Sequence, residues 1–290
     1  MKKTYLIINR LAGGKRMKNR ISQLFDGFKK QSVNISFNYT ERKGHAVELA
    51  QKAVAEKYDI IVAVGGDGTV NEVAGGLAGS GVTMGIIPMG SGNGLARELK
   101  IPLNIKKAIE IIIKGKDKPV DIWQMNNRSF LCAAGLGFDA AVAKKMTLSS
   151  KRGFWEYIRL TIKGSLSAKP VNISLLVKNH RIEKLVFMAS FANASQLGNN
   201  AFISPGAKPD DGLLDIVLIK PMYKIFYPVL GLALFLRVIH WFKFFERHRV
   251  NSVIIQNASS NLFHTDGESV KMEFPVRINL LKDKLKVRVL

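Results

Sequence analysis

Short apolar runs alternate with longer amphipathic segments over the first part of the chain. The run at 59–64 is β-branched and apolar throughout, which is typical of a strand buried on both faces of a parallel sheet. The pattern predicts strands at 4–9, 34–39, 59–64 and 83–88, and helices at 16–31, 44–56, 69–78, 94–98 and 105–114. Strands that alternate with helices indicate an α/β domain with a parallel sheet.

The texture of the sequence changes after Lys118 and Pro119. Strand-like runs then follow one another with little helix between them, at 120–125, 129–134, 171–177, 185–191 and 213–219. We therefore predict an α/β domain at 1–120 and a β-rich domain at 121–290. Alternating apolar and basic residues at 284–289 predict a half-exposed final strand, and the sequence leaves open whether this strand, near 280–290, returns to the first domain.

Two glycine-rich loops each follow a predicted strand and precede a predicted helix. The first is Gly65-Gly66-Asp67-Gly68-Thr69, with Asn71 and Glu72 behind it, and the second is Met89-Gly90-Ser91-Gly92-Asn93-Gly94. Glycines let the backbone approach a ligand closely, and the first turn of a helix presents unpaired N–H groups to an anion. Because the carboxyl ends of parallel strands lie along one edge, we expect both loops to meet over one phosphate-binding crevice. The alternative is a pair of connecting turns, with Asp67 as a helix N-cap.

Asp67 limits the kinds of ligand site that the first loop can form. An aspartate beside a triphosphate is unfavourable unless it holds a cation or takes a proton from an acceptor hydroxyl, and both conditions are met in a phosphoryl-transfer site. Neither loop has the Walker spacing or the dinucleotide-binding spacing, so an ordinary P-loop or NAD site is disfavoured.

With these loops, the chain resembles the diacylglycerol kinase catalytic family, which includes bacterial diacylglycerol kinases and related lipid kinases as well as the sphingosine and ceramide kinases. The resemblance covers nearly the whole chain. Its blocks, in order, are Ile8-Asn9 with Gly13-Gly14-Lys15, Thr40 with Gly44-His45, the Gly-Gly-Asp-Gly-Thr loop, the Gly-Ser-Gly-Asn loop, Gly135-Leu136-Gly137-Phe138-Asp139, Ser204-Pro205-Gly206-Ala207 running to Asp210-Asp211-Gly212-Leu213-Leu214-Asp215, and Asp266-Gly267-Glu268. One departure is visible, since the family usually has proline where this chain has Arg10, and the first loop is expected to be looser for that reason.

The resemblance implies a two-domain lipid kinase that binds ATP in the cleft between an α/β domain and a β-sandwich-like domain. The positions implied to surround the nucleotide are Asn9, Thr40, Gly65, Gly66, Asp67, Gly68, Thr69, Asn71, Glu72, Ser91, Gly92 and Asn93. Asp266 is implied to accept the proton of the lipid hydroxyl, and Asp67 to take part in catalysis. Glu268 is implied to lie beside the transferring phosphate, through Mg²⁺.

Two further sites in the second domain are implied by the same resemblance. A structural Mg²⁺ is expected at the Asp211 carboxylate and the carbonyls of Lys208 and Leu213, because a hard cation takes oxygen ligands. A solvated turn before a strand is the alternative for these residues. Asp139 matches the acceptor-binding aspartate of sphingosine kinases, and its alternative role is to cap a helix at 140–146.

Asp266 and Glu268 form the sharpest carboxylate pair outside the loops. On an extended segment, alternate residues point the same way and can reach one site together. The competing interpretation is a β-turn between a strand that ends near Phe263 and one that begins near Val270, since Asp and Gly favour turns.

The chain is strongly basic, with 44 Lys plus Arg against 22 Asp plus Glu and a formal net charge of +22. Such a field attracts polyanions. We find no recognition-helix motif, no zinc-finger spacing and no paired aromatic residues on a predicted sheet, so a nucleic-acid partner is disfavoured. Anionic lipid headgroups explain the charge as well, and a solvated basic surface is the remaining interpretation.

The best membrane candidate lies at 222–250. A helical wheel separates a basic side from an apolar side: Arg237, His240, Lys243 and Arg247 against Val238, Trp241, Phe242 and Phe245. This pattern is typical of a helix in a membrane interface, and the apolar part at 225–236 is shorter than the about twenty residues of a membrane span. A core helix, or a segment packed at one end and exposed at the other, is the alternative.

The N-terminal segment reads as a strand rather than a signal peptide, and the single cysteine, Cys132, can form no intrachain disulfide. We therefore expect a cytoplasmic protein bound peripherally to an anionic membrane surface at the inner leaflet, where its lipid substrate lies. The oligomeric state is not readable from the sequence, and a homodimer stays open.

These features together predict ATP- and Mg²⁺-dependent phosphorylation of a lipid hydroxyl. Overall length favours diacylglycerol, by analogy with the bacterial members, and a sphingoid base, ceramide or phosphatidylglycerol stays open as the acceptor. A soluble-acceptor kinase of the NAD kinase type is less well supported, because the Asp-Gly-Glu and Pro-Gly-Ala blocks and the basic amphipathic stretch argue against it. A non-catalytic binding protein is less well supported, because Asp67, Glu72, Asp266 and Glu268 are retained together.

Overall fold

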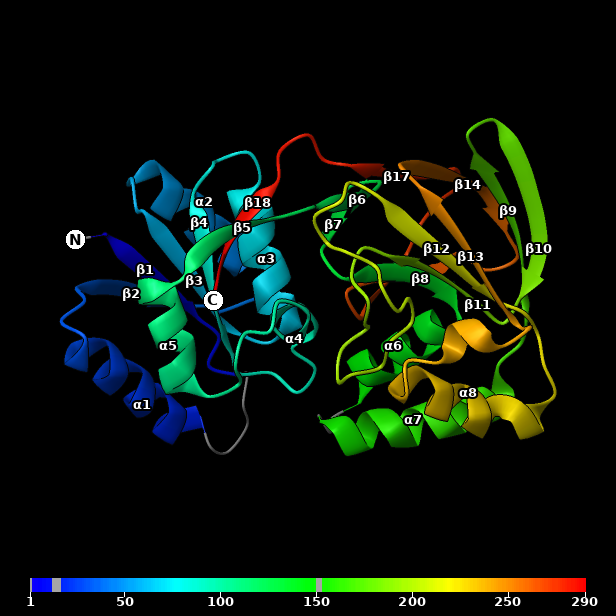
Figure 1. The fold of residues 1–290 in the computed structure, drawn as a ribbon, viewed down its shortest axis with the longest axis horizontal. Helices are drawn as coiled ribbons and strands as arrows, with labels where there is room; N and C mark the ends of the chain where they lie inside the picture. The colour runs from blue at the N-terminus through cyan, green and yellow to red at the C-terminus, as the bar shows by residue number, and fades with distance from the viewer. Residues whose placement is uncertain (1, 12–16, 150–152) are drawn as a thin grey trace. The chain divides into compact units, whose positions relative to one another are not determined.

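The structure is a computed structural model that describes residues 2–11, 17–149 and 153–290. The chain divides into two compact units, Met1–Ile122 with Lys282–Leu290, and Trp123–Leu281 (Figure 1). The chain end therefore belongs to the first unit, a point that the sequence left open. The block Gly13-Gly14-Lys15 of the family resemblance lies outside the described residues.

In the part of the chain that the structure describes, the first unit has one six-stranded sheet in the order β2-β1-β3-β4-β18-β5. Its strands are β1 (Thr4–Ile8), β2 (Ile35–Tyr39), β3 (Ile60–Gly65), β4 (Thr83–Pro88), β5 (Lys116–Val120) and β18 (Leu285–Val289). The pairings from β2 through β18 are parallel, and β5 is antiparallel to β18. β3 and β4 are buried along their whole length, as the apolar runs predicted.

The helices of the first unit follow the predicted order: α1 (Met17–Lys30), α2 (His45–Ala55), α3 (Asp67–Leu77), α4 (Gly94–Glu98) and α5 (Ile105–Lys114). α5 shows why these segments are helical. Ile105, Ala108, Ile109 and Ile112 recur at helical spacing and are all buried. Asn104 caps this helix, because its side chain accepts a hydrogen bond from the Lys107 backbone N–H.

The final strand is locked into the first sheet by buried charges. Leu285 and Val287 are buried, as the alternating pattern predicted, but Arg288 is buried as well. Its Nε lies 3.1 Å from the Asp117 carboxylate. Lys284 Nζ lies 2.9 Å from the fully buried carboxylate of Asp121. These two pairs tie the chain end to the segment around β5.

The second unit has, among its described residues, two antiparallel sheets of six strands, in the orders β10-β9-β14-β17-β6-β7 and β13-β12-β11-β8-β15-β16. The strands of the first of these are β6 (Trp123–Met125), β7 (Arg128–Phe130), β9 (Val171–Val177), β10 (His180–Val186), β14 (Ser252–Ala258) and β17 (Val276–Leu280). Those of the second are β8 (Ala133–Gly137), β11 (Met188–Ala192), β12 (Leu214–Ile219), β13 (Phe245–Val250), β15 (Leu262–Thr265) and β16 (Glu268–Lys271).

Both sheets contribute to one core, in which Trp123, Leu175 and Ile255 of one meet Phe191, Ile216 and Phe263 of the other. Face-to-face packing around a shared core makes this unit a β-sandwich. The predicted fold class, an α/β domain followed by a β-sandwich-like domain, is confirmed.

The outer face of the β8-containing sheet has a second apolar core, to which α8 (Tyr227–Phe235) and the 3-10 turn η3 (Ile239–Trp241) contribute Leu230, Ala233 and Ile239. Helix α6 (Phe138–Leu148) follows β8 directly, and α7 (Phe154–Ser167) packs on α6. The sequence analysis missed α7, whose Gly164 and β-branched residues have low helix propensity.

Three predicted strands are each two strands. The segments 120–125, 129–134 and 185–191 break into β5 and β6, β7 and β8, and β10 and β11. The residues at the breaks, Asp121–Ile122, Leu131–Cys132 and Phe187, are buried. Without exposed turn residues, these breaks left no signal in the sequence.

Within the membrane candidate at 222–250, the helix does not extend over the basic side of the helical wheel, Arg237, His240, Lys243 and Arg247. The segment leaves α8 at Leu236, passes through η3, and becomes the strand β13 from Phe245 onward. The alternation of Arg247 and Arg249 with His248 and Val250 serves pairing with β12 instead of a helical face. Long-range sheet pairing here overrides a helical periodicity.

Candidate functional site

Four neighbouring strands of the first sheet end at the same level. Ile8 lies opposite both Tyr39 and Val64, Val64 lies opposite Ile87, and Gly65 lies opposite Pro88. The residues after these strands therefore share one edge of the sheet, and they include Asn9, Thr40 and both glycine-rich loops. The structure brings together the loops that the sequence predicted to meet.

The two loops touch through their backbones. Met89 N–H donates a hydrogen bond of 2.7 Å to the Gly65 carbonyl. A Cβ atom at Gly90 would lie 2.6 Å from the Gly66 Cα, closer than real Cβ contacts. Glycine is thus required at this crossing by packing alone.

Asp67 joins the two loops through its side chain. Its carboxylate accepts hydrogen bonds from the backbone N–H of Asn93, at 2.8 Å, and of Gly94, at 2.6 Å. These N–H groups begin α4, so Asp67 caps the next helix rather than its own. The catalytic role that the resemblance implies for Asp67 stays a prediction.

Glu72 does the same for α2. Its two carboxylate oxygens accept from the N–H of Gly44, at 2.9 Å, and of Ala46, at 3.2 Å. Asn9 is held nearby, since its Nδ2 donates to the Thr69 hydroxyl at 3.0 Å. The implied nucleotide residues are therefore joined to one another and to the neighbouring helices by hydrogen bonds.

Donors rather than carboxylates are left to meet a phosphate at this edge. The first turn of α3 offers the N–H groups of Gly68 and Thr69, which have no partner within an α-helix. Ser91 is exposed, while Gly92 and Asn71 are half-buried. This donor set fits the triphosphate that the resemblance implies, and the individual roles stay predictions.

Two arginines that belong to none of the family blocks also lie at this edge of the sheet. Arg20 of α1 donates to the carbonyls of Met89, at 3.3 Å, and of Pro88, at 3.2 Å. The guanidinium of Arg10, at the position where the family usually has proline, lies 3.6 Å from the centre of the Tyr39 ring. This cation–π contact joins Arg10 to the end of β2, and the expected looseness of the first loop stays a prediction.

In the second unit, Asp266 and Gly267 form a tight hairpin turn between β15 and β16. Their φ angles are 46° and 81°, and Thr265 pairs with Glu268 across the turn. Positive φ at both central residues defines a type I′ turn. The premise of an extended segment, with Asp266 and Glu268 pointing the same way, is therefore wrong, and the turn interpretation is right.

The turn aims the Asp266 carboxylate at the break between β7 and β8. It accepts backbone N–H groups from Leu131, at 2.8 Å, Cys132, at 2.8 Å, and Ala133, at 3.0 Å. Three charge-assisted hydrogen bonds fix the orientation of the carboxylate. The resemblance implies that this carboxylate receives the hydroxyl proton, and that role stays a prediction. Glu268 is the first residue of β16, two positions after Asp266 in the chain.

Asp139 is paired inside the second unit. Its Oδ2 lies 3.0 Å from His264 Nε2, its Oδ1 accepts the Ala140 N–H, and both side chains are buried. The Gly267 N–H donates to His264 Nδ1 at 3.4 Å, which assigns the ring proton to Nε2. Burial raises the pKa of the Tyr157 hydroxyl, and the negative charge of Asp139 raises this pKa further.

His264 was missed by sequence reasoning, because a lone histidine in a strand has no spacing signal. In the structure it connects Asp139, at the start of α6, to the turn that holds Asp266. The implied acceptor-binding role of Asp139 stays a prediction, and both of its oxygens have protein partners.

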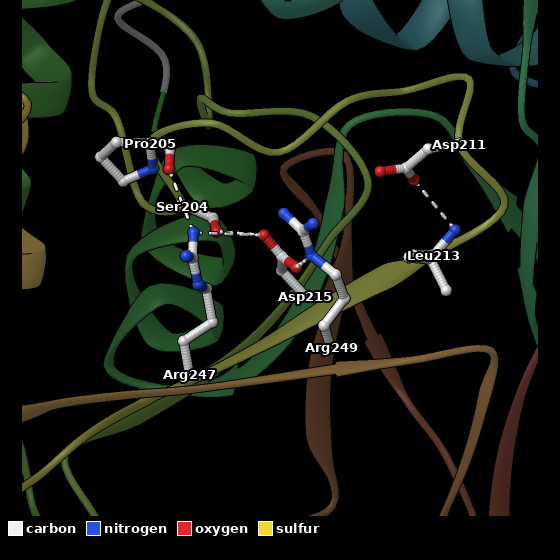
Figure 2. Close-up of polar contacts among 7 residues, drawn as sticks. All are labelled: Ser204, Pro205, Asp211, Leu213, Asp215, Arg247 and Arg249. Atoms are coloured by element: carbon white, nitrogen blue, oxygen red, sulfur yellow. Dashed lines mark hydrogen bonds and ion pairs between the residues drawn. The ribbon is translucent and has the colours of Figure 1, made fainter.

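The loop between Ser204 and Leu214 is tied down by a buried carboxylate (Figure 2). Asp215 accepts the Ser204 hydroxyl at 2.6 Å and Arg249 Nε at 3.0 Å. Arg247 lies 3.7 Å from the same carboxylate and donates to the Pro205 carbonyl at 3.1 Å. Two cations on β13 thus clamp the loop that carries the predicted Mg²⁺ ligands.

Asp211 lies apart from this clamp in Figure 2 and is exposed, with its Oδ1 accepting the Leu213 N–H at 3.0 Å. Within the described ranges, no group of three or more His, Cys, Asp or Glu could hold a metal ion. Mg²⁺ usually keeps several waters and binds one or two carboxylates, so Asp211 with the carbonyls of Lys208 and Leu213 fits a hydrated Mg²⁺. That ligand set stays a prediction.

The family resemblance is confirmed by comparison with known proteins. Residues 3–125 match the family described as diacylglycerol kinase catalytic domain. Residues 132–289 match the family described as YegS C-terminal NAD kinase beta sandwich-like domain. A diacylglycerol kinase of Bacillus subtilis (strain 168) is 31% identical over 229 residues, which cover 76% of this chain and 74% of that protein. A diacylglycerol kinase of Staphylococcus aureus (strain MRSA252) is 32% identical over 228 residues, covering 76% and 71%.

Two crystal structures from Bacillus anthracis str. Sterne are similar over the whole chain. One, described as a diacylglycerol kinase, has a TM-score of 0.75 and 25% identity, covering 100% of this chain and 97% of the other. The second, described as a candidate diacylglycerol kinase, has a TM-score of 0.82 and 26% identity at the same coverage. The fold and the two-part organisation are therefore those of these proteins.

Proposed function

Since the chain belongs to the diacylglycerol kinase family of ATP-dependent lipid kinases, we propose that it transfers the γ-phosphate of ATP to the hydroxyl of diacylglycerol and so forms phosphatidic acid. The observation that carries the nucleotide half of this proposal is the joined pair of glycine loops, with their helix N-termini at one sheet edge. Backbone donors in that arrangement recognise phosphate without reading a base.

The acceptor half rests on Asp266. In the proposed reaction the lipid hydroxyl oxygen attacks the γ-phosphorus, the bond from that phosphorus to the bridging oxygen breaks, and ADP leaves. The hydroxyl proton passes to the Asp266 carboxylate, which three backbone N–H groups hold in place. Bound Mg²⁺ would neutralise charge on the phosphates, and the family resemblance implies Glu268 and Asp67 as the carboxylates for it.

We place this reaction at an anionic membrane surface. Diacylglycerol keeps its chains in the bilayer and presents its hydroxyl at the water boundary, so the enzyme must approach lipid headgroups. The net charge of +22 supports that location, because each Lys or Arg near an anionic surface contributes about 1 kcal/mol of attraction.

The deciding experiment measures transfer of labelled phosphate from ATP to lipids in mixed vesicles. Separate reactions contain diacylglycerol, ceramide, sphingosine or phosphatidylglycerol as the acceptor, and a further reaction contains NAD without lipid. We expect labelled phosphatidic acid as the main product. Stronger labelling of another lipid would show that this lipid, and not diacylglycerol, is the acceptor. Labelling of NAD alone would overturn the proposal of lipid kinase activity.

A further inference from the structure

The segment from Tyr223 to Trp241 leaves many large apolar side chains in solvent. It comprises the 3-10 turn η2 (Lys224–Phe226), α8 and η3. Its large exposed apolar side chains, which we call the α8 surface, are Tyr223, Ile225, Phe226, Val229, Leu232, Phe235, Leu236 and Trp241. Ile225 is 78% exposed, Leu232 60% and Trp241 76%. Exposed apolar side chains that cluster in this way mark a binding surface.

The α8 surface is one side of a helix whose other side is already packed. Ile225, Val229, Leu232 and Leu236 recur at helical spacing and point outward. Leu230 and Ala233 are buried in the core against Val217 and Ile219 of β12. The helix is therefore apolar all round, although the protein covers only one face, and a helix of this composition is normally buried.

The charge around the α8 surface identifies the partner. The sequence from 216 to 245 contains no Asp or Glu. Exposed basic residues flank the apolar side chains on both ends, namely Lys220, Lys224, Arg237, His240 and Lys243. A second copy of the chain would bring the same basic flanks and the same net charge of +22, so an anionic surface is the better match.

We propose that the α8 surface inserts into the headgroup region of an anionic bilayer and holds the enzyme there. Tyr223 and Trp241 stand at the two ends of the segment, and such amphipathic rings are favoured at the membrane–water boundary. α8 has nine residues and is about 14 Å long, which suits a helix lying in the interface. Within the described part of the chain, no helix is long and apolar enough to cross a membrane.

This inference rests on the proposed function only in that the acceptor lies in a bilayer, and the binding itself requires no catalysis. The test is sedimentation of the purified whole protein with vesicles that lack diacylglycerol and ATP. One vesicle is phosphatidylcholine alone, and the other is phosphatidylcholine with an equal part of phosphatidylglycerol. We expect binding to the anionic vesicle that weakens as salt increases.

The variant Ile225→Asn/Leu232→Asn removes apolar area from the α8 surface, at one position in η2 and one in α8, and leaves the packed side of α8 intact. We expect it to lose roughly tenfold or more of its affinity for the anionic vesicle. Leu185→Asn is the matched control, because Leu185 is 49% exposed on β10 of the same unit, and we expect its binding to be unchanged. Kinase activity on a short-chain, water-soluble diacylglycerol should be preserved in both variants.

Three outcomes would overturn the proposal. The first is unchanged vesicle binding in the double variant. The second is an equal loss of vesicle binding in Leu185→Asn. The third is a wild-type dimer that the double variant converts to monomers with full vesicle binding, which would assign the α8 surface to a second copy. A chain that binds vesicles through α8 but phosphorylates no lipid would keep this inference and refute the proposed function.

Discussion

At the scale of single residues, the carboxylates of the family motifs are used in the architecture as well as in the implied chemistry. Asp67 and Glu72 cap α4 and α2, and Asp266 binds the backbone between β7 and β8. Each of them accepts backbone N–H groups that would otherwise lack a partner. Substituting these residues therefore changes local structure and charge together, and tests of their chemistry need a stability measurement beside the activity.

The variant Asp266→Asn tests the proton acceptor. We expect turnover to fall by about a hundredfold or more, because an amide cannot take the hydroxyl proton, while the dissociation constant for ATP stays unchanged. Glu273→Gln is the control, since Glu273 is an exposed carboxylate of the same unit. Initial rates measure turnover, and calorimetric titration measures the dissociation constant for ATP. Wild-type turnover in Asp266→Asn would show that another group accepts the proton.

The variant His264→Ala tests the link between Asp139 and the Asp266 turn. Removing the ring takes away the side-chain partner of Asp139 Oδ2 in a buried site, which costs about 1–3 kcal/mol of stability. We also expect turnover to fall more than ATP affinity, since the turn loses the acceptor for the Gly267 N–H.

Denaturant unfolding and kinetics are measured together for this variant. His264→Gln is the partial replacement, because its amide can still donate to Asp139, and it should recover part of both losses. A loss of stability with turnover unchanged would limit His264 to packing.

At the scale of elements, the two glycine loops act as one unit because their backbones cross without side chains. α3 and α4 receive their positions from the strands before them, and Asp67 then couples the two helices. Sequence spacing alone locates each loop, but the distance between them follows from the parallel pairing of β3 with β4.

The variant Gly90→Ala tests this crossing. The added methyl group would meet the Gly66 backbone at 2.6 Å, so the loops must separate, and overpacking of this kind costs about 1–3 kcal/mol. We expect ATP affinity to fall by about tenfold, which corresponds to 1.4 kcal/mol.

Gly75→Ala is the control for this substitution. Gly75 lies within α3 with nothing within 4 Å of an added Cβ, so alanine should leave ATP affinity unchanged and raise stability slightly. ATP titration of both variants decides the matter, and equal affinity in Gly90→Ala and wild type would contradict a shared phosphate edge.

At the scale of the whole molecule, the first unit is closed by the end of the chain. β18 lies between β4 and β5 in the sheet, and Arg288 and Lys284 pair with Asp117 and Asp121. The first unit is therefore built from two separate segments of the chain, whereas the second unit is one continuous segment from Trp123 to Leu281.

Deleting residues 284–290 tests this closure. The deletion exposes the edge of β4 and leaves the Asp121 carboxylate buried without its cation, a strongly destabilising change. We expect hydrogen exchange to lose protection throughout the first unit while the strands of the second unit stay protected. Deleting Leu290 alone, which is 81% exposed, should change neither. Full protection of β3 and β4 in the longer deletion would show that the first unit closes without β18.

Much of this protein could be predicted from local sequence. Apolar periodicity located the elements of the first unit, because strands buried on both faces and amphipathic helices have distinct repeats. Glycine-rich loops after those strands indicated phosphate, and the spaced blocks indicated the kinase family, which comparison confirmed.

Tertiary structure decided the rest, because it depends on partners far apart in the chain. Buried strand breaks such as Leu131–Cys132 have no turn residues that would mark them in the sequence. Their backbone N–H groups donate to the carboxylate of Asp266, more than a hundred residues later. The segment at 237–247 has helical periodicity, yet pairing with β12 turns its end into a strand. His264 and Asp139, 125 positions apart, meet only because β15 pairs with β8. The sequence by itself determined which local elements and which motif chemistry are present, whereas non-local pairing decided which charges meet and which apolar faces stay uncovered.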